Sequence, residues 1–279
     1  MPANEDQIKF WNDKAGQDWT DLQERMDANL SGIHEALMAF AAPAPGMAIL
    51  DVGCGTGTTS MALARIAGPT GRVSGVDISR PMLGLARQRA EKAGLKIAFA
   101  EADAATQRFA PEHDLVFSRF GVMFFDDPVA AFANIKTALK AGGRLAFVCW
   151  RTPPENPWAS APLAAARPFL PEQPPPDPLA PGPFAFADPE RVKDILGKAS
   201  FGDVTVTKYD GVMGMGRDMD TVAAQTLRIG PLSRAIGEAD EAARANIVAA
   251  VRAALEKFRA PSGEITPPTA CWLVRAATA

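Results

Sequence analysis

Cysteine, histidine and tyrosine are scarce in this chain of 279 residues, which contains three, two and one of them. Cys54, Cys149 and Cys271 lie far apart in apolar strings, with no C-x-x-C pair and no nearby histidine partner. Such spacing argues against a disulfide framework and against a metal centre. We therefore expect three reduced, buried thiols and no bound metal.

Long apolar runs and an excess of positive charge are also lacking. No run approaches the roughly 18 apolar residues that a membrane span needs, and the opening MPANEDQ lacks the layout of a signal peptide, so we expect a cytoplasmic protein. The net charge of -3 argues against a protein that binds nucleic acid through its phosphates. With 47% hydrophobic and 22% charged residues, the composition is that of one globular α/β domain with additions.

The most informative stretch is ILDVGCGTGTTS, residues 49–60. Its apolar beginning predicts a buried strand, and the pattern becomes helical from Ser60. Between them, Gly53, Gly55 and Gly57 allow a sharp turn and let a ligand lie against bare backbone. A helix that starts there also directs free N–H groups into the same space. The stretch predicts a nucleotide-type site at a strand-to-helix turn.

The glycine spacing separates two ligand classes. A dinucleotide fingerprint, G-x-G-x-x-G, requires a third glycine where this chain has Thr58, and Asp51 before the first glycine is foreign to it. The stretch instead resembles motif I of class I S-adenosylmethionine-dependent methyltransferases, D-x-G-C-G-x-G after an apolar run. The resemblance implies S-adenosyl-L-methionine as cofactor and a doubly wound, Rossmann-like α/β sheet of seven strands whose last strand is antiparallel.

Later strands also end in acidic or polar residues. Asp77 follows Gly53 by 24 residues, one β-α-β unit, which places its carboxylate at the end of the neighbouring strand. It can accept hydrogen bonds from ribose hydroxyls there, a demand that NAD and S-adenosylmethionine share. A third strand, KIAFAEAD, ends at Asp103, a fourth, DLVFS, runs into RFGVMFF, and RLAFVCW at 144–150 is predicted as a fifth.

The resemblance assigns roles to these positions. Asp103 and Ala104 would contact the adenine, and Ser118, Arg119 and Phe120 the methionine part of the cofactor. A surface acid remains the alternative for Asp103, and a surface salt bridge for Arg119. The full expected cofactor site comprises Asp51, Gly53, Cys54, Gly55, Thr58, Asp77, Ile78, Met82, Asp103, Ala104, Ser118, Arg119, Phe120, Trp11 and Trp19.

The chain divides into four expected parts. Residues 1–45 form a helical arm, helical over 5–41, whose two tryptophans either cover the cofactor or pack on the core. Residues 46–150 form the cofactor-binding core, and 151–187 form a surface lid with little regular helix, because thirteen of the 24 prolines lie between Pro153 and Pro189. Residues 188–279 complete the sheet with strands at 204–209 and 271–276. Within them, 211–268 form a helical substrate cap with two helical patterns, or alternatively core packing or a homodimer surface.

The expected activity is methyl transfer to a small, partly apolar molecule, by resemblance to the ubiquinone/menaquinone C-methyltransferase group. Alternatives are different chemistry with the same cofactor, such as cofactor modification or demethylation, and a non-catalytic binding module. No catalytic residue is assigned. His113 precedes a strand at the opposite edge, His34 is expected to be solvated or satisfied in the core, and Tyr209 is the only tyrosine.

Overall fold

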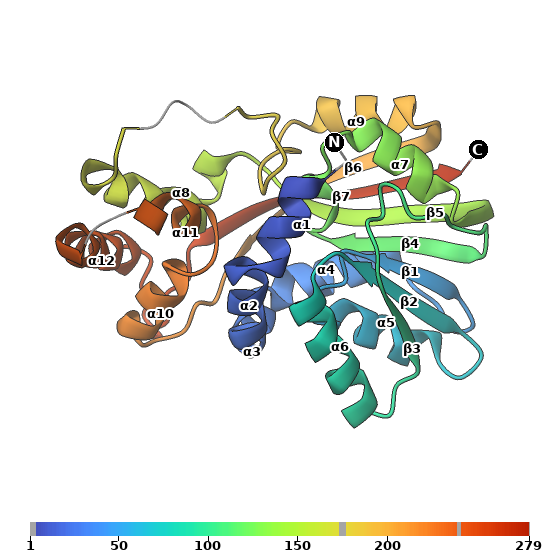
Figure 1. The fold of residues 1–279 in the computed structure, drawn as a ribbon, viewed down its shortest axis with the longest axis horizontal. Coiled ribbons are helices and arrows are strands. Elements are labelled where there is room, and N and C mark those ends of the chain that lie inside the picture. Colours follow the sequence, from blue (N-terminus) through green and yellow to red (C-terminus); the bar gives the residue numbers. More distant parts are fainter. Residues whose placement is uncertain (1–3, 173–176, 239–240, 279) are drawn as a thin grey trace.

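The computed structural model describes residues 4–172, 177–238 and 241–278, which contain a mixed sheet of seven strands (Figure 1). The strands are β1 (Ala48–Val52), β2 (Arg72–Asp77), β3 (Ile97–Glu101), β4 (His113–Arg119), β5 (Leu139–Trp150), β6 (Phe201–Val212) and β7 (Pro268–Thr278). Their order is β3-β2-β1-β4-β5-β7-β6, and β7 runs antiparallel to β5 and β6. This confirms the predicted doubly wound sheet with an antiparallel last strand.

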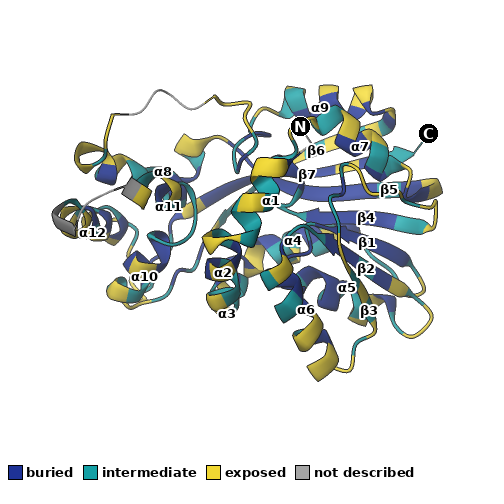
Figure 2. Ribbon diagram, viewed as in Figure 1, coloured by how far each residue is buried: buried dark blue, intermediate teal, exposed yellow. Residues whose placement is uncertain are grey.

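The helices that follow the first strands pack on the sheet. They are α5 (Thr58–Ala67), α6 (Arg80–Lys92), α7 (Pro128–Lys136) and α9 (Pro189–Lys198). Helix α5 packs against β1, β2 and β3, whereas α7 and α9 pack together and against β5 and β6. The central strands are buried (Figure 2), and the core includes the fully buried rings of Phe117, Phe132 and Phe147.

The amino-terminal arm consists of four short helices where one helical stretch was predicted. They are α1 (Glu5–Asn12), α2 (Lys14–Asp21), α3 (Gln23–Asn29) and α4 (Ser31–Ala41). Helix α4 packs against β4, β5, β6 and β7, so the end of the arm belongs to the core of the domain. Helices α1–α3 lie in Figure 1 between the sheet and a second group of helices.

Local sequence determines several helix starts. Asp127, Asp188 and Asp218 accept hydrogen bonds from first-turn backbone N–H groups of α7, α9 and α10 (Met219–Thr226), at 3.0, 2.9 and 3.0 Å. The start of α6 lacks such a side-chain cap. Ser79 occupies the cap position, but its hydroxyl donates to the carbonyl of Trp11 at 2.7 Å and thereby ties the arm to the sheet.

The proline-rich stretch contains regular helix, contrary to the prediction. Helix α8 (Pro157–Ala166) begins at a proline, where no backbone donor is needed, and has only Pro162 in its interior. Pro162 lacks a backbone donor, and the packing of α8 against α12 (Glu241–Glu256) offsets the loss of that hydrogen bond. Short 3-10 turns, η2 (Pro153–Glu155) and η3 (Arg167–Phe169), flank α8. Residues 173–176 of the predicted lid lie outside the described residues.

The segment between β6 and β7 carries the predicted helical insertion, with three α-helices where two were expected. They are α10, α11 (Pro231–Ala235) and α12, and the short turn η4 (Ile236–Glu238) lies between α11 and α12. Ile247, Val251 and Leu255 form an apolar stripe on α12 and are fully buried. Together with α8 these helices form a group beyond the carboxyl ends of β1, β2 and β4 (Figure 1), which we call the cap.

Strand β5 begins at Leu139, five residues before the predicted start at Arg144. Its pairing with β4 shifts register between His113 and Leu115, and Gly142 in this irregularity has φ 74°. Glycine adopts this left-handed conformation without strain, so the chain passes through the bulge and stays in the sheet. In the described ranges, no helix has both the length and the apolar composition that crossing a membrane requires.

Candidate active site

A cavity of about 1410 Å³ lies between the carboxyl edge of the sheet, the arm and the cap. Its floor is formed by the turns after β1, β2, β3 and β4, and its opposite wall by α8, α10 and α11 with the segment around Phe184. Ligands of open α/β sheets bind at this edge, where the loops after the parallel strands converge. The cavity is therefore the candidate active site.

The glycine turn after β1 brings two loops into backbone contact. Gly53 has φ 67°, and a Cβ placed on it would lie 2.7 Å from the Cα of Gly121. A Cβ on Gly121 would in turn lie 2.7 Å from the carbonyl oxygen of Val52. Side chains at either position would push apart the loops after β1 and β4. Their absence lets the two loops lie in contact and leaves bare backbone in the cavity lining.

Asp77 lies beside this turn at the end of β2. One carboxylate oxygen accepts from the backbone N–H of Gly55 at 2.7 Å, and the other from the N–H of Ser79 at 2.8 Å. Burial raises the pKa of Asp77, and the backbone hydrogen bonds oppose that rise. Each carboxylate oxygen can accept a second hydrogen bond. Asp77 therefore retains the acceptor capacity that a ribose diol requires.

Asp103 lies in the same cavity and is hydrogen-bonded to Asn4, a residue that the sequence did not single out. The amide Nδ2 of Asn4 donates to both of its carboxylate oxygens, at 3.0 and 2.9 Å, and the N–H of Ala105 donates at 2.8 Å. Ala104, the other expected adenine contact, also lines the cavity. The amino end of the arm thus reaches the subsite predicted for adenine.

Arg119 ends β4 and lines the cavity through a buried side chain. Its Nη2 lies 3.5 Å from Asp27 Oδ1, so the expected alternative of a surface salt bridge is replaced by a largely buried pair with α3. Asp27 also binds Arg89 at 3.0 Å and the hydroxyl of Thr58 at 2.6 Å. Burial lowers the pKa of Arg119, and in the described structure its Nη1 has no hydrogen-bond partner. This donor is unpaired, but it has almost no accessible surface, so a carboxylate reaches it only after the side chain shifts.

Phe120 has a left-handed backbone, φ 64°, which is rare for a residue with a Cβ and costs about 1 to 3 kcal/mol. This backbone directs the ring onto Trp150 in a parallel stack, with centroids 4.2 Å apart and planes 8° from parallel. Trp158 continues the cluster at 4.7 Å from Trp150. The loop after β4 therefore presents an aromatic surface to the cavity immediately after the cationic Arg119.

Twelve of the fifteen predicted cofactor residues line the cavity, while Asp51, Thr58 and Ser118 lie behind its wall. Asp51 is fully buried and accepts from the hydroxyls of Thr59 and Ser60 at 2.5 and 2.6 Å. Ser118 donates to the carbonyl of Val52 at 2.7 Å. These three side chains brace the first turn of α5 and the loop after β4 through these hydrogen bonds and through the bond of Thr58 to Asp27. Their contact with a ligand stays a prediction.

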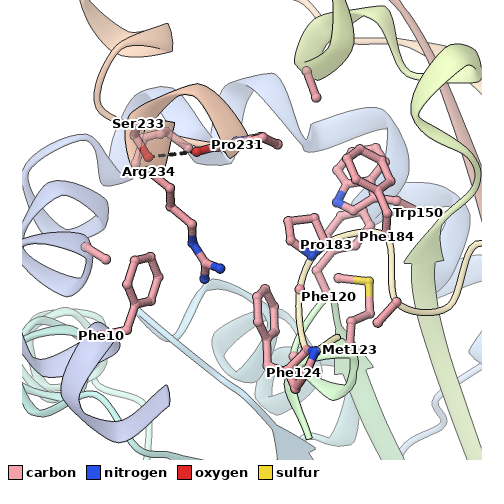
Figure 3. A pocket seen from close by; sticks show the side chains of 18 of the residues that line it. Phe10, Phe120, Met123, Phe124, Trp150, Pro183, Phe184, Pro231, Ser233 and Arg234 are labelled. Carbon is pink, nitrogen blue, oxygen red and sulfur yellow. Dashed lines mark hydrogen bonds between the residues drawn. The ribbon is translucent and has the colours of Figure 1, made fainter. Parts of the chain in front are cut away.

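The aromatic residues of the arm face the cavity from the other side. Trp11 packs edge-on against Phe124 of η1 (Val122–Phe124), with ring centroids 5.3 Å apart, and against Trp19 at 6.3 Å. Both tryptophans line the cavity, as do the buried Met213 and Met215 that follow β6. Figure 3 shows Phe120, Met123, Phe124, Trp150 and Phe184 around the same open space.

The described lining of the cavity offers carboxylates but no imidazole, amine or phenol as a general base. Among the described residues that line it there is no histidine, lysine or tyrosine. His113 binds Ser74 and the Ala138 carbonyl at 3.0 and 3.1 Å, whereas His34 on α4 and Tyr209 on β6 lie outside the lining. No cluster of three or more histidine, cysteine, aspartate or glutamate residues in the described ranges could hold a metal ion.

Three functional candidates were missed by the sequence analysis: Asn4, Asp27 and Arg234. Each lies in a segment that was read only as helical pattern, and each reaches the cavity through tertiary contacts. An aspartate on a helix face does not indicate which residue it pairs with, and the partner of Asp27, Arg119, is 92 residues away in the chain. No local motif could have identified these three.

The cavity fits S-adenosylmethionine at both ends of that molecule. Asp77 retains lone pairs for the ribose, and Arg119 has a buried, unpartnered donor for the methionine carboxylate. The bare backbone of Gly53 and Gly55 lies between them in the lining. The cationic sulfonium would lie near the aromatic surface of Phe120 and Trp150, whose faces attract positive charge.

Comparison with known proteins agrees with this geometry. Residues 49–143 match a family described as "Methyltransferase domain". The chain is 38% identical over 113 residues to aklanonic acid methyltransferase of Streptomyces sp. (strain C5), covering 40% of this chain and 51% of that protein. It is 36% identical over 124 residues to the ubiquinone/menaquinone biosynthesis C-methyltransferase of Bordetella parapertussis, covering 43% and 48%. The chain thus spans about half the length of these curated relatives.

The fold also matches a solved structure. The YcgJ protein of Bacillus subtilis superposes with a TM-score of 0.57 at 16% identity, over 88% of this chain and 97% of that one. At this identity the likeness shows the fold alone. The glycine turn, the strand order and the match over 49–143 converge on one family. Over residues 49–143 the chain matches a methyltransferase domain, and its sheet has the fold of the class I S-adenosylmethionine-dependent methyltransferases.

Proposed function

We propose that this protein transfers a methyl group from S-adenosylmethionine to a small, partly apolar acceptor. The observation that carries the proposal is that one cavity contains both the Asp77 and Arg119 floor and the aromatic wall around Trp150. The printed names of the two curated relatives, which concern aklanonic acid and ubiquinone or menaquinone, support a small acceptor with apolar parts.

The cofactor supplies an electrophilic methyl group when it is bound. The residues of this chain hold and align the two reactants. Orientation of this kind can supply about 7 to 11 kcal/mol of the barrier. Asp77 and Arg119 hold the two ends of the donor, and the arm and cap exclude water from the aromatic half of the cavity.

The wall also constrains the acceptor. Because the described lining lacks histidine, lysine and tyrosine, a proton that must leave the acceptor passes to a carboxylate or to water. An acceptor whose nucleophilic atom is already unprotonated, or only weakly basic, suits this wall. An enol, a phenol or a carboxylic acid meets this condition, and an alkyl ammonium does not.

The test begins with ligand choice. Isothermal calorimetry should show micromolar binding of S-adenosylhomocysteine and no binding of NAD, because the turn lacks the third glycine of a dinucleotide site. Incubation with S-adenosylmethionine and a panel of aromatic enols, phenols and carboxylic acids should then give products heavier by one CH₂ in mass spectra. Tighter binding of NAD would refute the family-based assignment. Cofactor binding without transfer to any acceptor would favour a binding module.

A further inference from the structure

Arg234 extends from α11 in the cap into the cavity (Figure 3). Its guanidinium lies 4.0 Å from the ring centroid of Phe10, a cation–π contact between the cap and the arm. Within the described part of the chain, the guanidinium has neither an ion pair nor a hydrogen bond. Ser233 beside it does not compete for a ligand at this point, since its hydroxyl donates to the Gly230 carbonyl at 2.7 Å.

Two other arginines that line the cavity have ion-pair partners, in contrast to Arg234. Arg119 pairs with Asp27, and Arg228 pairs with both Asp18 and Asp21 at 2.6 Å. Their charges are compensated by the protein, whereas the charge of Arg234 is not. A guanidinium is planar and permanently charged, and it binds carboxylate, sulfonate or phosphate oxygens through two parallel N–H donors.

The surroundings of Arg234 strengthen such a bond. Phe10 and Phe124 flank the guanidinium, and Phe120, Trp150 and Phe184 face the same open space (Figure 3). Arg234 is an exposed residue of the cavity wall, but the rings beside it reduce the water near its guanidinium, and a charge-assisted hydrogen bond gains strength as water is excluded. The same rings offer flat surfaces on which an aromatic body can pack.

We propose that the methyl acceptor is an aromatic or polycyclic anion, and that Arg234 binds its anionic group while the rings of the cavity hold its apolar body. This inference rests on the proposed function, because it specifies the acceptor of that site. Arg234 is a binding residue in this scheme, and selectivity for anionic over neutral acceptors follows from it.

The test uses two fluorescent probes with the same ring system. Anilinonaphthalene sulfonate carries an anion, and phenylnaphthylamine does not. With S-adenosylhomocysteine bound, Arg234→Gln should weaken binding of the sulfonate probe roughly tenfold or more and leave the neutral probe unchanged, as expected when a charged hydrogen bond is lost. Arg234→Lys keeps the charge without the planar fork and should lose less. Displacement by naphthoate and by naphthyl phosphate then tells whether a carboxylate or a phosphate is preferred.

Two arginines serve as matched controls. Arg167 lines the cavity directly after the end of α8. Arg65 lies exposed on α5, outside the cavity lining. Neither Arg167→Gln nor Arg65→Gln should reproduce the loss. An equal loss in either control, or equal weakening of both probes by Arg234→Gln, would overturn the proposal. Calorimetry with S-adenosylhomocysteine distinguishes failure of this inference from failure of the proposed function. If S-adenosylhomocysteine still binds but Arg234→Gln weakens both probes equally, only the inference about the acceptor fails.

Discussion

The side-chain amide of Asn4 binds the carboxylate of Asp103, with Nδ2 at 3.0 Å from Oδ1 and 2.9 Å from Oδ2. Asn4 also donates its backbone N–H to Asp126 Oδ2 at 2.8 Å and accepts from the N–H of Asp126 at 3.0 Å. It is buried, with 3% of its surface exposed. One residue thus connects the arm to the loops after β3 and η1. It does so through the acid that the family resemblance assigns to adenine.

Changing Asn4 to aspartate should release the arm. The new carboxylate would face the carboxylate of Asp103, and like charges at hydrogen-bond distance repel. Trypsin should then cut after Lys9 and Lys14 severalfold faster, and S-adenosylhomocysteine should bind less tightly because the arm that covers it is loosened. Gln17→Glu, on the exposed side of α2, is the control. Unchanged cleavage would show that α1 is held by other contacts, and the cover hypothesis for Trp11 would lose its support.

Replacement of Arg119 by glutamine should weaken the binding of S-adenosylhomocysteine more than that of methylthioadenosine. Its free Nη1 is expected to bind the amino-acid carboxylate, and loss of a charged hydrogen bond costs about 1.5 to 3 kcal/mol. Methylthioadenosine lacks that carboxylate, so its affinity should hardly change. Both dissociation constants are measured by calorimetry.

Arg89→Gln is the matched control for Arg119. Arg89 also binds Asp27, at 3.0 Å, but does not line the cavity. Its loss should affect both ligands alike. If Arg119→Gln weakens both ligands equally, the residue acts through Asp27 and the glycine turn, and the carboxylate contact is wrong.

Asp77→Asn should weaken S-adenosylhomocysteine and methylthioadenosine by the same factor, because both carry the ribose. The asparagine side chain has one acceptor oxygen where aspartate has two, and a ribose hydroxyl is left without its partner at about 1 to 3 kcal/mol. This corresponds to roughly fivefold to a hundredfold in affinity. Glu101→Gln at the exposed end of β3 provides the control. Unchanged affinity for both ligands would place the ribose elsewhere.

The sequence alone was sufficient for the part of the site that local chemistry determines. The strand-turn-helix from Ile49 to Ser60 and the acid at Asp77 depend on contacts between neighbouring β-α units, so motif and spacing predicted them. Asn4 and Arg234 reach the site from segments that are remote in the chain, and their partners are set by tertiary packing. Asn4 and Asp103 are 99 residues apart, and no periodic pattern connects them.

The prediction of little helix in the proline-rich stretch was wrong, because it counted prolines and did not consider where in a helix each one would lie. The prolines between 153 and 189 argued against helix, yet Pro157 starts α8 because a first-turn residue needs no backbone donor. Conversely, Ser79 occupies a cap position but binds the Trp11 carbonyl in place of its own helix. In both cases the outcome depended on which partner the fold brings close.

The last prediction concerns Asp51 and the pH dependence of stability. Burial raises the pKa of Asp51 from 3.8 to about 6, although the hydroxyls of Thr59 and Ser60 and the charge of Arg119 oppose the rise. Between these two values the folded protein holds a proton that the unfolded chain has released. The contribution of this residue to stability is therefore fully present below pH 3.8 and is lost as the pH rises through about 6.

The Asp51→Asn variant removes this titration. From about pH 4 to about pH 7, the free energy of unfolding of the unmodified protein should fall relative to that of the variant by up to about 3 kcal/mol. Urea denaturation at the two pH values measures this difference, and the titration of Asp77 cancels because both proteins contain it. Asp114→Asn should show the opposite sign, in the acid range at about pH 4 and below. Hydrogen bonds from Lys140 and from the N–H of Ala48 lower the pKa of Asp114 against its partial burial, so its stabilising contribution is present at neutral pH and lost in acid. If the stability of the unmodified protein and that of the Asp51→Asn variant changed in parallel with pH, Asp51 would be ionised throughout, and the fully buried carboxylate would have to be compensated by Arg119.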